Sequence, residues 1–170
     1  MQKEETQGCV SLGPCEAKGR TATRSIRRLT LVTSLACLAL APVSRAHAAL
    51  LLGIGDKCLD VEAGNTADGT PVNIFHCHGG FDQQWIVERG EIVGIGEKCL
   101  DVPSGNTTDG TPVQLFTCNG GANQQWHVQN GAIVGIGGKC LDVPSGNTTD
   151  GTRVHIFTCN GGANQQWSVR

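Results

Sequence analysis

The sequence CLDVPSGNTTDG occupies residues 99–110 and returns unchanged at residues 140–151. A close variant, CLDVEAGNTADG, occupies residues 58–69, so the motif recurs at a constant interval of 41 residues. Internal repetition at a period of about 20 to 50 residues is typical of architectures in which one unit is a single supersecondary element that cannot bury a core alone. The chain is therefore a tandem array of three units, and we expect its fold and its sites to occur in triplicate.

The repetition extends over the whole unit. A second cysteine and a tryptophan keep the same interval in every copy: Cys77, Cys118 and Cys159, and Trp85, Trp126 and Trp167. We place the three repeats at residues 50–90, 91–131 and 132–170. The last two are nearly identical, since residues 92–128 and 133–169 differ at five positions.

The first 48 residues have a different composition. Arg24, Arg27 and Arg28 precede an apolar run at residues 29–43, and a small-x-small sequence ends at Ala48. A basic flank, a short apolar core and such a site are typical of a secretory signal peptide, and the run is shorter than the roughly 20 residues of a transmembrane helix. Residues 1–48 are therefore predicted to be a polar leader plus a secretory signal peptide. We expect residues 49–170 to be a secreted, extracellular domain that does not insert into membranes after cleavage.

The predicted mature domain is acidic. From Ala49 onward, eight aspartates and four glutamates stand against three lysines and three arginines, a net charge of −6. Nucleic-acid binding depends on clustered Lys and Arg side chains that neutralise phosphates, and anionic membranes attract the same side chains. The composition therefore argues against both kinds of partner.

Six cysteines remain in this domain, two per unit and 19 residues apart. A threefold repeat admits chiefly two symmetric arrangements of disulfides, within each unit or between neighbouring units. We expect pairing within each unit: Cys58 with Cys77, Cys99 with Cys118, and Cys140 with Cys159. Zinc sites favour closer ligand pairs, and the histidines that flank Cys77 do not recur in the other units. We therefore expect no metal and no cofactor.

Each unit is predicted to contain four short strands. In the middle unit, β-branched runs occupy residues 92–95 and 98–102, residues 111–118 alternate between apolar and polar, and residues 125–128 form the last run. A strong tight-turn dipeptide, Asp109-Gly110, separates two of them, and no window has an apolar stripe at helical spacing. Many short strands at regular spacing favour a barrel or a sandwich, and threefold symmetry favours a barrel.

The motifs C-L-D-V, V-Q-L-F-x-C and N-Q-Q-W, each repeated in recognisable form three times, resemble those of the ricin-type β-trefoil lectins, a family that includes the carbohydrate-binding modules of many secreted glycosidases. The resemblance covers residues 51–170. It implies an all-β fold, a β-trefoil of three ~41-residue repeats and twelve short strands with pseudo-threefold symmetry. It also implies that the tryptophans are core residues.

Sugar recognition needs hydrogen-bonding groups for hydroxyls and a flat apolar surface for the sugar ring, and a carboxylate makes the stronger hydrogen bonds. One aspartate follows the Cys-Leu pair of every unit, and the strand periodicity places Gln114 and Phe116 together on the face opposite Val113 and Leu115. The resemblance implies carbohydrate-binding roles for four kinds of residue. These are an anchoring aspartate (Asp60, Asp101, Asp142), a stacking aromatic (Phe75, Phe116, Phe157), a loop residue (Asp82, Asn123, Asn164) and a supporting glutamine (Gln83, Gln124, Gln165). The outward polar strand residue, Asn73, Gln114 or His155, completes each candidate site.

Two features depart from the family pattern. The platform is Phe where the family usually has Trp or Tyr, and Phe has no polar group and a smaller face. The first unit has Asp82 in place of the loop Asn and Asn73 in place of the strand Gln. These changes bring a second carboxylate near Asp60 and predict a first site that is weaker or binds a different sugar.

Three functions compete. The first is a secreted, multivalent, non-catalytic carbohydrate-binding protein with up to three equivalent shallow sites, expected to be a monomer. The second is an enzyme, which we do not expect, because glycoside hydrolysis needs two carboxyl groups roughly 5–10 Å apart and only Asp60 with Asp82 offers a pair. The third is a protein-binding or protease-inhibitory trefoil without sugar binding, in which the anchoring aspartates only stabilise turns. The aspartates before turn glycines, Asp68, Asp109 and Asp150, are interpreted as turn formers.

Overall fold

The computed structural model describes residues 47–170. The predicted leader and signal peptide fall almost entirely outside these residues, so they stay a prediction. The backbone of the barrel begins at Ala49, whose N–H donates to the carbonyl oxygen of Trp85 (2.8 Å) and whose carbonyl accepts the Trp85 N–H (2.9 Å). Within the described part of the chain, no helix has the length and apolar character that crossing a membrane requires.

The described residues form fourteen strands. The first unit contains β1 (Leu51–Leu52), β2 (Lys57–Val61), β3 (Thr70–His76) and β4 (Ile86–Glu88). The second contains β5 (Glu91–Gly94), β6 (Lys98–Asp101), β7 (Thr111–Pro112), β8 (Gln114–Thr117) and β9 (His127–Gln129). The third contains β10 (Ala132–Val134), β11 (Lys139–Asp142), β12 (Thr152–Arg153), β13 (His155–Thr158) and β14 (Ser168–Val169).

Two of the twelve predicted strands are interrupted, which accounts for the count of fourteen. The breaks fall at Val113, between β7 and β8, and at Val154, between β12 and β13. The Val113 N–H donates to the carbonyl of Val154, and the Val154 N–H donates to the carbonyl of Val72, both at 3.1 Å. These backbone groups bond to the neighbouring unit, because each lies where two units meet.

Helical structure in residues 47–170 is limited to 3-10 turns of three residues. Every unit has three of them: η1 (Ile54–Asp56), η2 (Glu62–Gly64), η3 (Phe81–Gln83), η4 (Ile95–Glu97), η5 (Pro103–Gly105), η6 (Ala122–Gln124), η7 (Ile136–Gly138), η8 (Pro144–Gly146) and η9 (Ala163–Gln165). The expected near-absence of helix is thus confirmed for this part of the chain.

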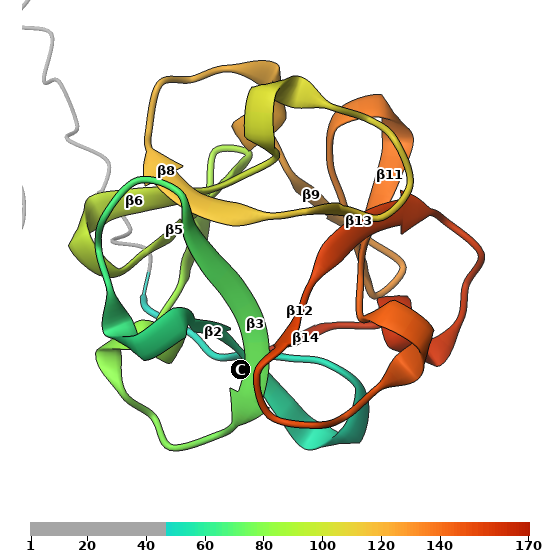
Figure 1. Ribbon diagram of the computed structural model, residues 1–170, viewed down its shortest axis with the longest axis horizontal. Helices are drawn as coiled ribbons and strands as arrows, with labels where there is room; N and C mark the ends of the chain where they lie inside the picture. Colours follow the sequence, from blue (N-terminus) through green and yellow to red (C-terminus); the bar gives the residue numbers. More distant parts are fainter. Residues whose placement is uncertain (1–46) are drawn as a thin grey trace, which may run out of the picture. The chain divides into compact units, whose positions relative to one another are not determined.

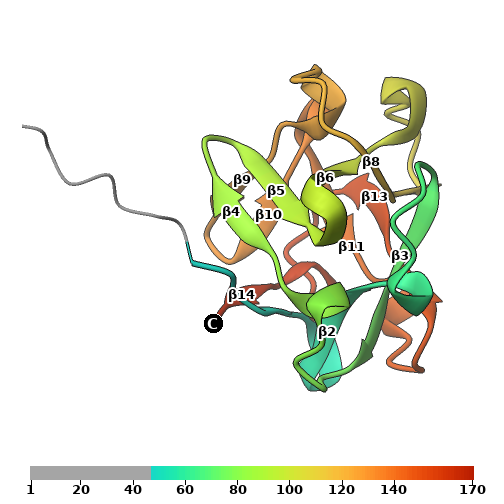
Figure 2. The ribbon, with the colours of Figure 1, turned by 90° about the vertical axis from the view of Figure 1, so that its left-hand side faces the viewer.

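The units surround a common axis, and Figure 1 looks along it. Hairpins join consecutive units, because β4 pairs with β5 and β9 pairs with β10. The two-residue turn between β9 and β10 has positive φ at Asn130 (50°) and Gly131 (80°), as a type I′ hairpin requires. The third equivalent pair is β14 with β1, which brings the two ends of the barrel together. Figure 2 shows these pairs at one end of the barrel. The predicted β-trefoil is confirmed.

The core repeats the same contacts three times. The buried residues include Trp85, Trp126 and Trp167, with 0%, 4% and 5% of their surface exposed. Each indole Nε1 donates to the carbonyl oxygen of a leucine in the same unit, Leu59, Leu100 or Leu141, at 2.9 Å. The tryptophans therefore anchor each unit to the barrel, as predicted, and their polar atom has a partner.

The disulfides join Cys58 to Cys77, Cys99 to Cys118 and Cys140 to Cys159, with Cα atoms 5.1 Å apart in every case. This confirms the pairing within each unit. A loop of this length contributes about 3 kcal/mol in the chain-entropy account of disulfide stabilisation.

The aspartates before the turn glycines lie in turns, as predicted, and also make contacts that the sequence interpretation did not include. Each accepts a hydrogen bond from the lysine of another unit: Asp68 from Lys98 at 2.6 Å, Asp109 from Lys139 at 2.7 Å, and Asp150 from Lys57 at 2.7 Å. The three pairs, which we call the ion-pair ring, link the first unit to the second, the second to the third and the third to the first. The lysine hydrogen bond lowers the pKa of each carboxyl group, and together with His76 it lowers the pKa of Asp150 to about 2.

Candidate functional site

In the second unit, Asp101 is the last residue of β6 and only 2% of its surface is exposed. Its Oδ2 accepts hydrogen bonds from Asn123 Nδ2 (2.6 Å) and Gln124 Nε2 (3.0 Å), and its Oδ1 accepts one from Gln114 Nε2 (2.8 Å). Three elements, β6, β8 and η6, thus bring four predicted site residues into one cluster.

The third unit repeats this cluster around Asp142. Asn164 Nδ2 and Gln165 Nε2 donate to Oδ2 at 2.8 and 2.9 Å. His155 takes the place of the glutamine, with its Nε2 2.8 Å from Oδ1. The His155 ring is stacked against that of Phe157, with centroids 5.7 Å apart and an interplanar angle of 24°. The strand alternation predicted from sequence therefore places a polar group and an aromatic ring side by side.

The glutamines lie behind the aspartates and not in front of them. Gln83, Gln124 and Gln165 have no exposed surface. Besides its bond to Asp101, Gln124 donates to the carbonyl of Thr117 (3.0 Å) and accepts the backbone N–H of Asn119 (2.8 Å). A side chain with these partners fixes the carboxylate and has no surface for a ligand, so its role is positional.

A hollow of about 200 Å³ opens in front of Asp142. It is lined by Asp142, Pro144, Ser145, His155, Phe157, Asn160 and Asn164. Phe157 is 37% exposed, so its ring is available to a ligand. Pro144, Ser145 and Asn160 were not predicted as site residues, although Pro144 and Ser145 belong to the motif that is repeated unchanged.

The first unit differs from the other two. Its hollow, of about 300 Å³, is lined by Asp60, Glu62, Ala63, Asn73, Phe75, His78, Asp82 and Gly151. Gln83 Nε2 donates to Asp60 Oδ2 at 3.0 Å as in the other units. Burial raises the pKa of Asp60 against the effect of the Gln83 hydrogen bond, and the nearby Asp82 carboxylate raises it further. The sequence prediction that a second carboxylate lies near Asp60 is thus met by the geometry.

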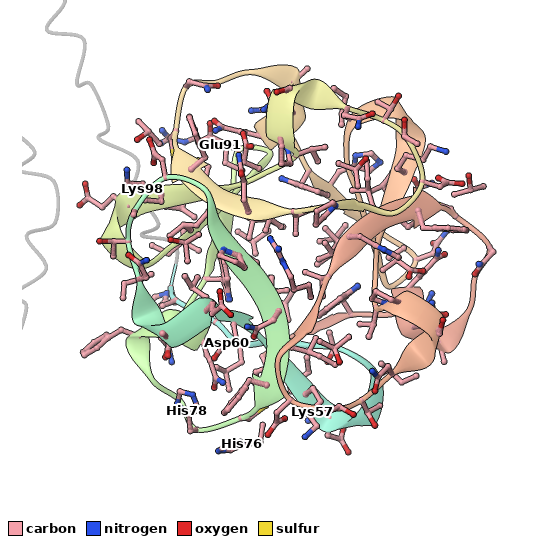
Figure 3. The ribbon with its side chains drawn as sticks, in the orientation of Figure 1. Lys57, Asp60, His76, His78, Glu91 and Lys98 are labelled. Atoms are coloured by element: carbon pink, nitrogen blue, oxygen red, sulfur yellow. A yellow bond between two sulfur atoms is a disulfide. The ribbon has the colours of Figure 1, made fainter. Side chains whose placement is uncertain are left out.

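His78 also lines this hollow, although the sequence did not predict it as a site residue. Its Nε2 lies 3.6 Å from Asp60 Oδ2 and 4.0 Å from Asp82 Oδ2. Figure 3 shows Asp60 and His78 in the first unit, with His76 farther out toward the rim near Lys57. The signal for His78 was its position directly after the second cysteine of the unit, where the other units have Asn119 and Asn160.

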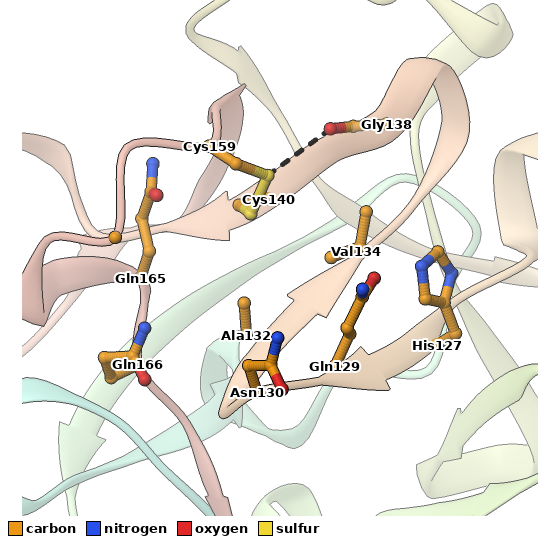
Figure 4. A pocket seen from close by; sticks show the side chains of 11 residues that line it. His127, Gln129, Asn130, Ala132, Val134, Gly138, Cys140, Cys159, Gln165 and Gln166 are labelled. Carbon is orange, nitrogen blue, oxygen red and sulfur yellow. Dashed lines mark hydrogen bonds between the residues drawn. A yellow bond between two sulfur atoms is a disulfide. The ribbon is translucent and has the colours of Figure 1, made fainter.

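A larger hollow, of about 450 Å³, lies between the β9–β10 hairpin and the third unit. Its lining is shown in Figure 4 and includes His127, Gln129, Asn130, Gln165 and Gln166 but no carboxylate. Without an acceptor-only anchor it lacks the main feature of the other two hollows, so we do not treat it as the candidate site.

Comparison with known proteins agrees with this geometry. Residues 52–167 match the family described as the ricin-type beta-trefoil lectin domain, and the chain belongs to this family. The designed threefold-symmetric protein ThreeFoil is 36% identical, with a TM-score of 0.67 over 72% of this chain and 96% of that one. An exo-beta-1,3-galactanase from Clostridium thermocellum is 29% identical, with a TM-score of 0.68 over 74% of this chain and 30% of that one.

The same fold occurs in the C-half of the earthworm R-type lectin, solved in complex with GalNAc, which is 17% identical, with a TM-score of 0.64 over 73% of this chain and 98% of that one. Membership of the family supports carbohydrate binding in general terms. The galactanase is an enzyme of which this chain matches less than a third, so the likeness concerns the trefoil part of that protein.

Proposed function

We propose that the chain is a secreted, multivalent, non-catalytic carbohydrate-binding protein with up to three shallow sites, centred on Asp60, Asp101 and Asp142. One observation carries the proposal: a fixed carboxylate and an exposed aromatic ring line the same hollow in the third unit. An ionised carboxylate offers about four acceptor positions, and the side chains described around Asp142 use three of them. The remaining position suits a sugar hydroxyl, and the Phe157 ring suits the apolar face of a sugar.

Multivalency follows from the repeat. The cluster around Asp101 has the same donors as the cluster around Asp142, apart from the exchange of Gln114 for His155. Linked sites raise avidity by about 10² to 10⁴ when they bind one target together. The three disulfides support an extracellular location, because disulfides persist mainly in oxidising compartments.

Two observations favour binding over catalysis. The second and third units have Asn123 and Asn164 where hydrolysis would need another carboxylate. In the first unit, Asp60 is only 4% exposed, and the carboxylates of Asp60 and Asp82 lie 3.6 and 4.0 Å from the same atom, His78 Nε2. The two carboxylates therefore face the same small space. Glycoside hydrolysis needs carboxyl groups that flank a sugar bond from opposite sides or leave room for water.

Binding to a glycan panel tests the proposal, with galactosides first, since one similar structure, the bitter gourd homologue at 23% identity, was solved with alpha-methyl-D-galactoside. The test variants replace Phe75, Phe116 and Phe157 by alanine, singly and together. The control is His127→Ser, which exchanges an exposed residue outside the site for its third-unit equivalent. We expect binding to fall stepwise with each phenylalanine removed and to be unchanged in the control. Glycan binding that survives the triple change would refute the role of the phenylalanine rings, and the absence of binding to any glycan would favour the protein-binding alternative.

A further inference from the structure

The hollow of the first unit lacks two of the hydrogen-bond donors that its counterparts have. Asp101 receives an N–H from Asn123 at 2.6 Å and another from Gln114 at 2.8 Å. The first unit has Asp82 and Asn73 at these positions. Asp82 has no N–H to offer and brings a second negative charge to within 4.8 Å of the Asp60 carboxylate. Hydrogen-bond donors hold the cluster together in the second and third units, whereas the cluster of the first unit is rich in acceptors.

Asn73 adds an unpaired oxygen to this cluster. It lies directly opposite Asp60 in the β2–β3 pair, so both side chains are on the same face of the sheet. It is 4% exposed and lines the same hollow. Within the described residues, its Oδ1 is a buried side-chain atom that has no hydrogen-bond partner. A buried polar atom without a partner is costly, so the site is incomplete without a positively charged or donating ligand.

His78 supplies a nitrogen ligand at the same place. One ligand atom each from Asp60, His78 and Asp82 lies within 4.8 Å of the others, and the His78 Nε2 distances are 3.6 and 4.0 Å. Two ligands of one zinc ion, bound at about 2.0–2.2 Å, are roughly 3.3–3.6 Å apart at the tetrahedral angle. The 3.6 Å distance from His78 to Asp60 therefore fits a single ion, and a small movement of Asp82, whose side chain is 23% exposed, would shorten the 4.0 Å distance and bring in the third ligand.

We propose that the hollow of the first unit binds one divalent metal ion of the zinc class through Asp60, His78 and Asp82. A ligand set of one imidazole and two carboxylates suits zinc and its neighbours, whereas calcium prefers oxygen ligands alone. Binding has an identifiable cost. The Gly80 N–H donates to His78 Nδ1 at 3.1 Å, and this exposed hydrogen bond must break so that the neutral ring can carry its proton at Nδ1 and bind metal through Nε2.

The repeats provide matched variants for the test. His78→Asn and Asp82→Asn place in the first unit the residues that the other two units have at the same positions, so the fold accommodates them. His76→Thr does the same for the neighbouring histidine, which contacts Asp150 and does not line the hollow. The first two variants remove proposed ligands, and the third is the control.

The experiment is a calorimetric titration of the full chain with zinc chloride and, separately, with calcium chloride, after alkylation of free thiols. We expect one equivalent of zinc to bind, an affinity at least about tenfold lower in His78→Asn and Asp82→Asn, and no change in His76→Thr. No binding at millimolar zinc, or equal binding by all variants, would overturn the proposal. Binding of calcium in preference to zinc would overturn the assignment to the zinc class.

A converse variant tests whether these side chains suffice. A triple variant of the second unit, Gln114→Asn with Asn119→His and Asn123→Asp, gives that unit the side chains of the first-unit hollow. We expect this variant to bind a second equivalent of zinc. The absence of that equivalent would refute the claim that the named residues alone define the site. The metal site shares Asp60 and Asp82 with the first proposed carbohydrate site, but the titrations contain no sugar, so their outcome does not depend on carbohydrate binding.

Discussion

Replacement of Gln124 by alanine should destabilise the protein far more than the same change at its neighbour Gln125. Gln124 is fully buried and makes three hydrogen bonds: two from Nε2, to Asp101 Oδ2 and the carbonyl of Thr117 (both 3.0 Å), and one at Oε1, from the N–H of Asn119 (2.8 Å). The adjacent Gln125 is exposed. The pair differs in environment and not in residue type, so it isolates the contribution of the buried network.

The magnitude follows from the groups left without partners. Each buried polar group that loses its partner costs about 1–3 kcal/mol, and water entering the vacated space satisfies part of the loss. We expect Gln124→Ala to lower the free energy of unfolding by roughly 3–5 kcal/mol, and Gln125→Ala to change it by less than about 0.5 kcal/mol.

Urea denaturation of the two variants and the wild-type chain, with the disulfides intact, measures the difference. A loss below about 1 kcal/mol in Gln124→Ala, or equal losses in the two variants, would refute the reasoning that this glutamine holds the Asp101 carboxylate in place. The equivalent changes at Gln83 and Gln165 provide two internal repetitions of the experiment.

Three further results are expected. In Gly94→Ala, the new Cβ would lie 2.7 Å from Cζ3 of the fully buried Trp85. Thermal denaturation should therefore show a free energy of unfolding lower by about 1–3 kcal/mol because of overpacking. Unchanged stability would mean that the indole can move aside. Arg89 has a left-handed φ of 51° at the position where the next unit has Asn130, and Asn tolerates this conformation better than Arg. Arg89→Asn should therefore raise the free energy of unfolding, measured by urea denaturation, by up to about 1 kcal/mol. A lower value would show that the backbone at Arg89 is not strained. The ion-pair ring stabilises the fold fully above the unfolded aspartate pKa of about 4. Because the pKa values of its carboxyl groups are lowered in the folded state, to about 2 for Asp150, its contribution is lost as the pH falls below about 4 and through these lowered values. As the pH is lowered through this range, the free energy of unfolding should fall less steeply in a variant with Lys57, Lys98 and Lys139 all replaced by methionine than in the wild-type chain. Identical pH profiles would show that the ring contributes nothing.

The repeat made much of the fold predictable. The constant spacing of the cysteines and tryptophans indicated three equivalent units, and with equivalent units the disulfide pairing had few symmetric solutions. The alternation of Gln114 and Phe116 with Val113 and Leu115 is a local property of a strand, so the outward faces were predictable as well.

Contacts between units could not be predicted in the same way. The partner of Asp150 is Lys57, 93 residues away, and only closure of the barrel brings the two together. Local sequence explains the turn at such an aspartate but contains no signal for its long-range partner. The breaks in the strands at Val113 and Val154 have the same origin, because their N–H groups bond to other units.

His78 was not predicted as a lining residue of the first-unit hollow for another reason. Sequence reasoning relied on recurrence, and His78 does not recur. It comes close to Asp60 and Asp82 because the loop after β3 folds back over the end of β2, and its Gly79 and His78 N–H groups are held by the buried Gln83 at 3.2 and 2.9 Å. A position at which one repeat differs from two others is a signal in itself, since the shared scaffold fixes where the new side chain will lie.

The pairing of β14 with β1 makes the two ends of the barrel a hairpin without a turn. The N–H of Leu50 donates to the carbonyl of Arg170 at 2.7 Å, and the N–H of Arg170 donates to the carbonyl of Leu50 at 3.0 Å. The hairpins β4–β5 and β9–β10 have the same geometry with an intact connection. The barrel is thus a ring that has been opened at one of three equivalent joints. A circular permutant that begins at Gly90 or Gly131, with Arg170 joined to Ala49 through one added residue that completes a two-residue turn, should therefore reach the same fold with its units in a different order.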